Sequence, residues 1–303
     1  MDMSSSPSAL QRKLVERQFV VTTELSPPDT AEPERIRAAA RILAPHADAI
    51  NATDGAGANC HMSSIAVCTI LASEGIESVW QITCRDRNRI AIQGDALGAA
   101  ALGVRNVLCL TGDDVTCGDH PAAARVFDLD SVTLLRCLRT MRDEACFMSG
   151  RGIEVAPNLF IGAVENPTNP PIELRVERVA RKIAAGAEFI QTNYIFDLDT
   201  FKTFMRRMRD RGLDHAIPIL AGVGPLSSAA AARRMMKRVP GLNIPEALID
   251  RLDRSRDPKR EGREICIELI QELAVEPGVS GVHLMAFRRE HEIAEILERA
   301  GVR

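Results

Sequence analysis

The stretch Glu77–Gly112 reads ESVWQITCRDRNRIAIQGDALGAAALGVRNVLCLTG, and it decides the fold. Its two ends, Glu77–Cys84 (ESVWQITC) and Asn106–Gly112 (NVLCLTG), are short apolar runs with β-branched residues, which is typical of buried strands. Between them the Ala-rich segment Ile90–Leu102 runs directly to Gly103, and glycine is the residue expected just past a helix end. The stretch therefore predicts one strand, one helix and a second strand.

The same unit recurs along the whole chain. Most of the β-rich runs start 28–30 residues apart, with longer gaps after the fourth and the seventh. This spacing fits one strand, one helix and two short loops. The runs number eight: Phe19–Leu25, Ala47–Thr53, Glu77–Cys84, Asn106–Gly112, Leu159–Asn166, Glu188–Phe196, Ala216–Val223 and Gly281–Phe287.

Helical patterns separate these runs, and they include Pro33–Leu43, Val176–Ala185, Pro245–Arg254 and Pro258–Ala274. Eight strand–helix units fill one closed (β/α)8 barrel, the α/β fold called the TIM barrel. An open doubly wound sheet is the alternative, but it normally has five or six strands and would leave two repeats unexplained. We therefore predict the eight-stranded barrel.

The length of 303 residues permits one barrel domain or two average domains. No low-complexity linker or sharp change in composition divides the chain. We therefore expect a single catalytic barrel domain over residues 1–303, with a helical extension over residues 1–18 and no regulatory domain after the eighth strand.

Composition narrows the class of protein. Hydrophobic residues make up 46% and charged residues 26%, which is ordinary globular usage. The 38 Lys and Arg against 41 Asp and Glu give a net charge of −3, and only 4% of residues are aromatic, so we expect no nucleic-acid partner. No signal peptide and no run of roughly 18 apolar residues is present, so we expect a cytoplasmic protein without a membrane partner.

The cysteines and histidines argue against a metal site. Eight cysteines lie far apart without a C-x-x-C pair, and we expect reduced, mostly buried thiols. Six histidines form no pair at i, i+3 or i, i+4, which is the spacing that helical metal ligands favour. We therefore expect no metal.

In a barrel of this kind, the carboxyl ends of the strands and the loops after them converge on one mouth. Several polar residues stand there. They are Glu24, Thr53, Asp54, Gln81, Thr83, Asp113, Asp114, Glu165, Asn166, Gln191, Asn193 and Arg289.

Glu24 follows the apolar residues of the first run, in a strand expected to be buried on both faces. Burial disfavours a charged carboxylate, so we expect a raised pKa that suits proton donation near neutral pH. The alternative is a structural carboxylate that pairs with a buried arginine or caps a loop.

Asp113 comes directly after Gly112, where glycine lets the backbone turn sharply and brings loop amides close to a ligand. A carboxylate at this turn could accept hydrogen bonds from the ring N–H or amino groups of a heterocycle such as a pterin. The alternative is an ordinary turn aspartate.

The helix after the fifth run places Arg175, Arg178 and Lys182 at i, i+3 and i+7, on one face, where they could hold a diphosphate. A solvated basic face is the alternative. The segment Asp54–Cys60 resembles a truncated G-x-G-x-x-G, but Cys60 occupies the place of the third glycine, so we reject a dinucleotide fingerprint.

Seven short motifs in the expected order resemble methylenetetrahydrofolate reductases. They are T-E-L-S-P-P (Thr23–Pro28), N-A-T-D-G-A (Asn51–Ala56), I-T-C-R-D-R-N-R (Ile82–Arg89), L-T-G-D (Leu110–Asp113), V-F-D-L-D-S-V (Val126–Val132), A-G-A-E-F-I-Q-T (Ala185–Thr192) and G-V-H-L-M (Gly281–Met285). The resemblance implies an eight-stranded barrel that carries a flavin, usually FAD. It also implies hydride transfer from NADH or NADPH through the flavin to 5,10-methylenetetrahydrofolate, giving 5-methyltetrahydrofolate. We further expect a homo-oligomer.

The resemblance also implies roles for particular residues. Glu24 matches the acid that protonates the folate nitrogen, and Asp113 matches the aspartate beside the flavin and the pterin. Other positions match the flavin-binding shell: Thr53, Asp54, Gln81, Thr111, Gly112, Phe127, Asp128, Asn166, Arg178 and Lys182. Positions on the folate side are Gln191, Asn193 and Arg289.

Three residues depart from the common family pattern. Gln81 replaces a histidine near the flavin, Asn193 replaces a longer glutamine, and Glu165 adds a charge where many members have a small residue. These changes keep two alternatives open. One is the same reaction without flavin, and the other is a folate-binding barrel that transfers one-carbon groups without redox chemistry.

Overall fold

Eight parallel strands pair in chain order, and β8 pairs with β1 to close a barrel. The computed structural model describes residues 6–239 and 241–302. The predicted (β/α)8 barrel is confirmed, and every expected β-rich run overlaps one strand. The strands are β1 (Val20–Leu25), β2 (Ala49–Ala52), β3 (Ser78–Thr83), β4 (Asn106–Leu110), β5 (Phe160–Glu165), β6 (Phe189–Tyr194), β7 (Ile219–Val223) and β8 (Val279–Leu284).

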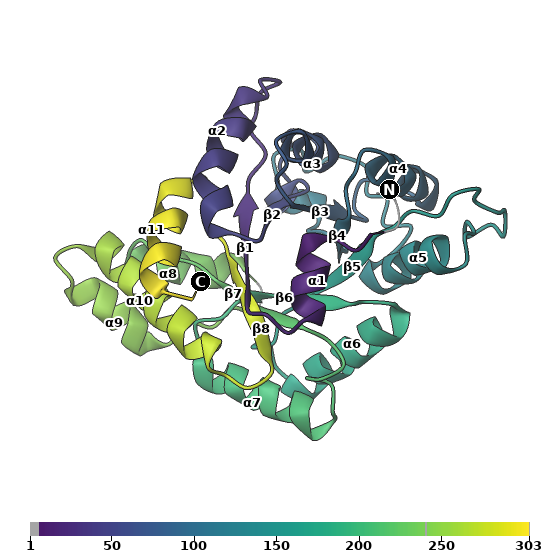
Figure 1. Cartoon of the computed structure of the whole chain (residues 1–303). Helices are drawn as coiled ribbons and strands as arrows, with labels where there is room; N and C mark the ends of the chain where they lie inside the picture. The colour runs from purple at the N-terminus through teal and green to yellow at the C-terminus, as the bar shows by residue number, and fades with distance from the viewer. Residues whose placement is uncertain (1–5, 240, 303) are drawn as a thin grey trace.

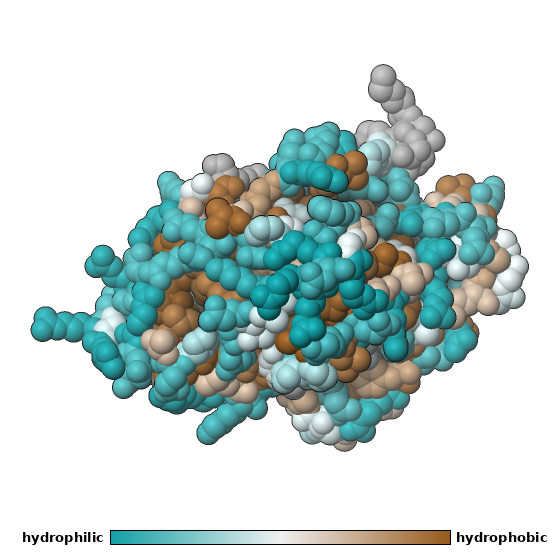
Figure 2. Space-filling view, turned by 90° about the horizontal axis from the view of Figure 1, so that it is seen from below, coloured by the Kyte–Doolittle hydropathy of each residue, from teal (hydrophilic) through white to brown (hydrophobic). Residues whose placement is uncertain are grey.

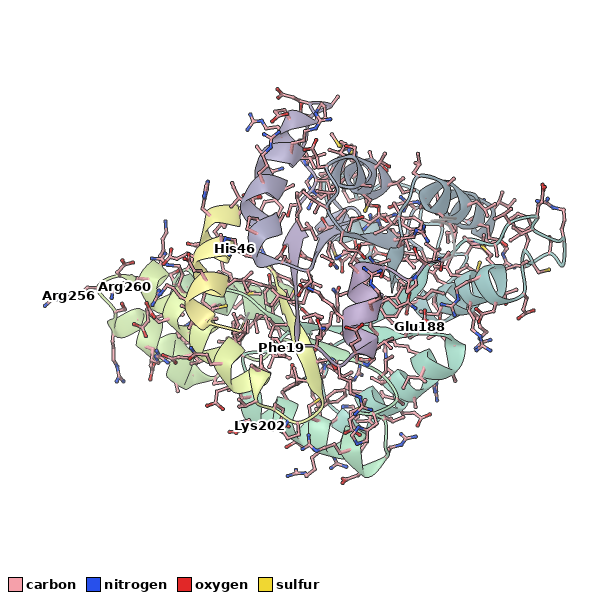
Figure 3. All side chains as sticks on the ribbon, in the orientation of Figure 1. Phe19, His46, Glu188, Lys202, Arg256 and Arg260 are labelled. Atoms are coloured by element: carbon pink, nitrogen blue, oxygen red, sulfur yellow. The ribbon has the colours of Figure 1, made fainter. Side chains whose placement is uncertain are left out.

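Helices form a ring around the barrel (Figure 1). The long gap before β8 holds three helices in place of one, and Arg256 and Arg260 at that bulge point away from the barrel (Figure 3). The ring consists of α2 (Glu34–Leu43), α3 (Ser64–Ser73), α4 (Arg89–Ala101), α5 (Ser131–Asp143), α6 (Ile172–Ala185), α7 (Leu198–Asp210), α8 (Ala229–Arg238), α9 (Glu246–Arg254), α10 (Pro258–Ala274) and α11 (Glu290–Ala300).

Helix α1 (Ala9–Val15) lies across the middle of this ring (Figure 1). It falls within the extension expected over residues 1–18, of which residues 1–5 lie outside the described part of the chain. Its buried Leu10 and Leu14 pack against inward-facing apolar side chains of the strands, Val20, Ala49, Val79, Leu108, Phe160, Phe189 and Leu220. The amino-terminal end of the barrel is therefore filled with apolar side chains. Phe19 and Glu188, labelled in Figure 3, immediately precede β1 and β6 and mark this end.

Gly162 on β5 leaves room for the ring of Phe189, which stacks on Phe160 with ring centroids 4.9 Å apart. A Cβ atom at position 162 would lie 2.2 Å from that buried ring. We expect Gly162→Ala to lower the free energy of unfolding by about 2–3 kcal/mol, because overpacking a filled core forces its neighbours to shift. Urea titration measures this change.

Gly98→Ala is the matched control, because Gly98 lies on helix α4 and, apart from the adjacent residues and backbone of that helix, no described atom lies within 4 Å of the added Cβ. Alanine favours a helix more than glycine does, so this control should be neutral or stabilising. Equal loss of stability in both variants would contradict the packing argument.

Above the apolar layer, the barrel interior becomes polar. Thr22, Asn51, Gln191 and His283 are all buried and come from four different strands. The amide groups of Asn51 and Gln191 bond to each other, and Thr22 bonds to both Gln191 and His283. Because every member of this layer has a partner, it forms a fixed polar floor beneath the carboxyl ends of the strands.

Most cysteines lie in the core, as the sequence predicts. Cys68, Cys84, Cys109, Cys137 and Cys266 are buried, Cys60 and Cys117 are exposed, and all eight are free thiols. Burial raises the pKa of Cys68 and of Cys84 to about 12, so both stay protonated thiols at neutral pH.

The outer surface is mostly hydrophilic on the face shown in Figure 2, where apolar side chains appear in spots interrupted by polar ones. Among residues 6–239 and 241–302, no helix combines the length and the apolar character that a membrane crossing requires.

Candidate active site

A cavity of about 470 Å³ opens at the carboxyl ends of the strands, above the polar floor. Strands β1, β3, β4 and β5, the loops that follow β2, β3, β4 and β5, the first residue of α5 and helix α6 supply its walls. Ten of the predicted site residues line it: Glu24, Thr53, Asp54, Gln81, Thr111, Gly112, Asp113, Asn166, Arg178 and Lys182. The structure therefore brings together residues that lie up to 158 positions apart in the sequence, as from Glu24 to Lys182.

Glu24 stands on β1 where the floor meets the cavity. Its side chain is 24% exposed, so the strand is not buried on both faces at this position, contrary to the expectation from sequence. The reason is that Glu24 points to the open mouth, whereas the rest of β1 is covered. Gln81 on β3 donates its Nε2–H to Glu24 Oε1 at 3.1 Å and holds that oxygen in place.

His283 on β8 is a further neighbour of Glu24, and the sequence reasoning did not identify it. Its Nε2 lies 3.6 Å from Glu24 Oε1, and its Nδ1 lies 2.9 Å from Thr22 Oγ1. Thr22 Oγ1 accepts a hydrogen bond from Gln191, so its own proton is free to go to Nδ1. The network is compatible with a neutral ring whose proton is on Nε2, facing Glu24, while Nδ1 accepts from the Thr22 hydroxyl. The signal in the sequence is a single polar residue between Val282 and Leu284 on a barrel strand.

Gln191, predicted to contact the substrate, lies in the floor below the cavity. It is 1% exposed, and its amide bonds to Asn51 and Thr22. In this structure Gln191 thus supports the residues beneath Glu24 and leaves no free amide group directed at the mouth.

The turn after β4 brings the backbone of Thr111, Gly112 and Asp113 to the wall of the cavity. Gly112 has a φ of +94°, which L side chains rarely adopt, and a Cβ there would lie 3.0 Å from Thr83 Cβ. Glycine is therefore needed on two counts, conformation and space. The turn places Asp113 on the wall of the cavity with Thr111 before it.

Thr53 and Asp54 follow β2 and line the same wall, but their polar groups differ in availability. Asp54 accepts hydrogen bonds from the backbone N–H and the hydroxyl of Thr83, both at 2.9 Å, and from Arg87 Nη1 at 2.7 Å. The hydroxyl of Thr53 is buried and has no hydrogen-bond partner in residues 6–239 and 241–302. Asp54 therefore fixes β2 to β3, and Thr53 is free to bond to a ligand.

The cation pair at the far wall consists of Arg175 and Arg178, which we name the arginine pair. Lys182, one turn further along α6, bonds to the buried carboxylate of Glu165 at 2.7 Å. Arg175 Nε is buried and has no hydrogen-bond partner within the described part of the chain. The unpartnered Thr53 hydroxyl and Arg175 Nε fit a bound group that has hydrogen-bonding ring edges and an anionic phosphate, as a flavin nucleotide or a nicotinamide dinucleotide has.

Besides Gln191, four predicted residues lie outside the lining of this cavity. Phe127 packs against the main hydrophobic core. Asp128 pairs with Arg89 at 2.8 Å, and hydrogen bonds from Arg89 lower the pKa of Asp128 to about 2. Asn193 accepts from the N–H of Tyr194 at 2.8 Å, and Arg289 donates to the carbonyl of Pro225 at 2.9 Å. Each of these four has a structural contact of its own.

Two larger cavities lie away from the strand ends. One of about 590 Å³ opens between α7, α9 and α10, and another of about 620 Å³ lies beside α1 at the amino-terminal end of the barrel. Neither is lined by the residues around Glu24. In the described part of the chain, no group of three or more His, Cys, Asp or Glu side chains is arranged to hold a metal ion.

Comparison with known proteins gives one consistent family. The family model for methylenetetrahydrofolate reductase matches residues 9–301. A probable methylenetetrahydrofolate reductase (NADPH) of Caenorhabditis elegans is 27% identical over 244 residues, which is 79% of this chain and 34% of the nematode protein. Methylenetetrahydrofolate reductase 1 of Schizosaccharomyces pombe is 26% identical over 84% of this chain and 40% of its own length. The chain thus spans well under half of these two relatives.

A bacterial relative and a solved structure match over the full length. The 5,10-methylenetetrahydrofolate reductase of Escherichia coli is 25% identical over 99% of this chain and 97% of its own. A Clostridium thermocellum protein described as binding two copies of 5-methyl-5,6,7,8-tetrahydrofolic acid superposes with a TM-score of 0.65 at 15% identity, covering 97% of this chain and 98% of its own. At that identity the second likeness shows a shared fold alone.

Proposed function

We propose that this chain, which belongs to the methylenetetrahydrofolate reductase family, interconverts 5,10-methylenetetrahydrofolate and 5-methyltetrahydrofolate. The observation that carries the proposal is the carboxylate of Glu24 at the cavity mouth, held by Gln81 and facing His283. A carboxyl group fixed at the edge of a ligand-sized cavity is suited to donate or accept one proton per turnover. We also propose that residues 1–303 form one catalytic domain, which the closed barrel supports.

The substrate chemistry assigns the task of Glu24. The one-carbon group bridges N5 and N10 in the substrate, and the product keeps it on N5. The bond to N10 must therefore break, and N10 must gain a proton. We propose that Glu24 donates this proton, which opens the bridge to an N5-iminium whose carbon accepts hydride. In the reverse direction, the Glu24 carboxylate takes the proton back.

The cofactor would occupy the cavity beside Glu24. A bound flavin, FAD in the usual case, would relay hydride between NADH or NADPH and the folate carbon. The Thr53 hydroxyl, the backbone of the Thr111–Gly112 turn and the arginine pair of α6 are the groups that would hold it. Asp113 would place a negative charge beside the ring system, where it would lower the flavin potential and could accept hydrogen bonds from the amino groups of the pterin.

The visible spectrum of the purified protein, before and after reconstitution with FAD, tests the cofactor. Stopped-flow measurement would then follow flavin reduction by NADH or NADPH and its reoxidation by methylenetetrahydrofolate. We expect both steps, with the two-band flavin spectrum bleaching and returning. Folate-dependent NADH oxidation by a protein that takes up no flavin would support direct hydride transfer instead. Folate binding without either redox step would support a non-redox one-carbon transferase.

His283 is proposed to position Glu24. We expect His283→Leu to lower kcat for folate turnover by about tenfold to a hundredfold with little change in KM, because the side chain lies beside Glu24 and is buried in the floor below the cavity. His283→Gln, whose amide N–H can replace Nε2–H, should restore much of the loss. Steady-state kinetics on both variants checks this, and a loss of the same size in both, or a change confined to KM, would contradict a positioning role.

A further inference from the structure

Lys182 is one of the three helix cations that by sequence could hold a diphosphate, but in the structure Glu165 already pairs with it. The two side chains are 2% and 1% exposed, and their charged atoms lie 2.7 Å apart. Lys182 also donates to the carbonyl oxygen of Val164. Burial lowers the pKa of Lys182, whereas the charge of Glu165 acts in the opposite direction. The ammonium group is thus held inside the wall by two acceptors of the protein itself.

The arginine pair lies farther from the carboxylate of Glu165 than Lys182 does. Arg175 Nη1 lies 3.6 Å from Glu165 Oε1, and Arg178 Nε lies 3.4 Å from Glu165 Oε2. Both distances suit ion pairing but are long for a good hydrogen bond. Each carboxylate oxygen of Glu165 already accepts a hydrogen bond. Oε2 accepts one from Lys182, and Oε1 accepts one from the backbone N–H of Asn166 at 3.1 Å. The guanidinium groups therefore retain donors for a ligand.

One of these donors is both buried and unpartnered. Arg175 is 9% exposed and lines the cavity, and its Nε has no hydrogen-bond partner among the described residues. An unsatisfied buried donor carries a desolvation penalty of roughly 1–3 kcal/mol, which a ligand acceptor at this point would remove. Three cations and one carboxylate leave a net charge of +2 at this wall, which matches the charge of a nucleotide's phosphate at neutral pH.

We propose that the arginine pair binds the phosphate of the nucleotide cofactor, and that Glu165 determines this choice by neutralising Lys182. This inference rests on the proposed function for the presence of the cofactor. Glu165 and the carbonyl of Val164 take two of the three N–H donors of Lys182, and moving the ammonium group toward a phosphate would leave Glu165 buried without its closest cation, which is strongly unfavourable. Phosphate chemistry is shared by flavin and nicotinamide nucleotides, so the binding experiment includes both.

Dissociation constants of FAD, FMN, riboflavin and NADH, from fluorescence titration, test the proposal. We expect Arg175→Gln and Arg178→Gln to weaken the phosphate-bearing ligand by about tenfold to a hundredfold each and to reduce the salt dependence of its binding. Riboflavin, which has no phosphate, should bind each variant as it binds the wild type. The double variant Glu165→Gln/Lys182→Met keeps the net charge of the wall and should bind within about threefold of wild type.

Arg181→Gln is the matched control, because Arg181 lies on the same helix, is 67% exposed and pairs with Glu177. If Arg175→Gln does not fold, Arg178→Gln at its half-exposed position still decides the question. Wild-type affinity in both arginine variants, with loss in the double variant, would make Lys182 the phosphate ligand and overturn the proposal. Arginine-dependent binding of NADH by a protein that takes up no flavin would uphold it and contradict only the flavin of the proposed function. Absence of binding of all three phosphate-bearing ligands would overturn both.

Discussion

Replacing Glu24 by glutamine is expected to lower the rate of the folate half-reaction by about a thousandfold, which is within the range that a general acid contributes. Glutamine keeps the size of the side chain and one oxygen for the hydrogen bond from Gln81, which is 3.1 Å from the carboxylate in the native chain. It has no acidic proton, so N10 of the folate would have to leave unprotonated. Stopped-flow reoxidation of the reduced enzyme by methylenetetrahydrofolate measures the effect.

The same variant should reduce its cofactor with NADH or NADPH at nearly the native rate, because that step needs no proton from Glu24. Glu74→Gln is the matched control, since this carboxylate pairs with Arg37 on the outer helices at 2.8 Å, far from the cavity lining. Equal loss in the two half-reactions would contradict the assigned role and would indicate a general disturbance of the cavity. A loss of the same size in Glu74→Gln would lead to the same conclusion.

The fold was predictable because strand and helix signals alternate at a nearly constant spacing. Errors were confined to the ends of the elements, and β7 shows the reason. The expected run began at Ala216, but the strand begins at Ile219, directly after Pro218. Proline has no N–H to donate to a neighbouring strand, so ladder pairing begins after it. The helix Pro258–Ala274 has the same two ends in the structure as in the prediction. Its start was predictable because Asp257 caps its first turn.

The candidate site was predictable only in part. Residues just past the strands, such as Thr53 and Asp113, were found because the topology of a barrel brings those positions to one mouth. His283 was missed because it lies within the body of β8, and its contact with Glu24 depends on the register in which Thr22 faces His283. The bond between Glu165 and Lys182 was missed for a similar reason, since it depends on how α6 packs on β5.

Replacing Lys182 alone by methionine is expected to lower the free energy of unfolding by about 3 kcal/mol. Methionine fills much of the same space, but it leaves the carboxylate of Glu165 buried at 1% exposure without its closest cation. Arg175 and Arg178 remain within 3.6 Å and offset part of the loss, so the expected effect lies at the low end for a broken buried ion pair. Urea titration without added cofactor measures it.

The double variant Glu165→Gln/Lys182→Met separates the cost of an unpaired charge from the loss of the pair itself. Removing both charges leaves no buried ion to compensate, and buried pairs replaced by neutral groups are often close to neutral in stability. We therefore expect the double variant to recover most of the stability lost by Lys182→Met, a coupling that a double-mutant cycle reports directly. If the two single changes instead add without coupling, Glu165 and Lys182 do not stabilise each other. In that case Lys182 would be free to bind a phosphate, and the choice of the arginine pair would lose its physical basis.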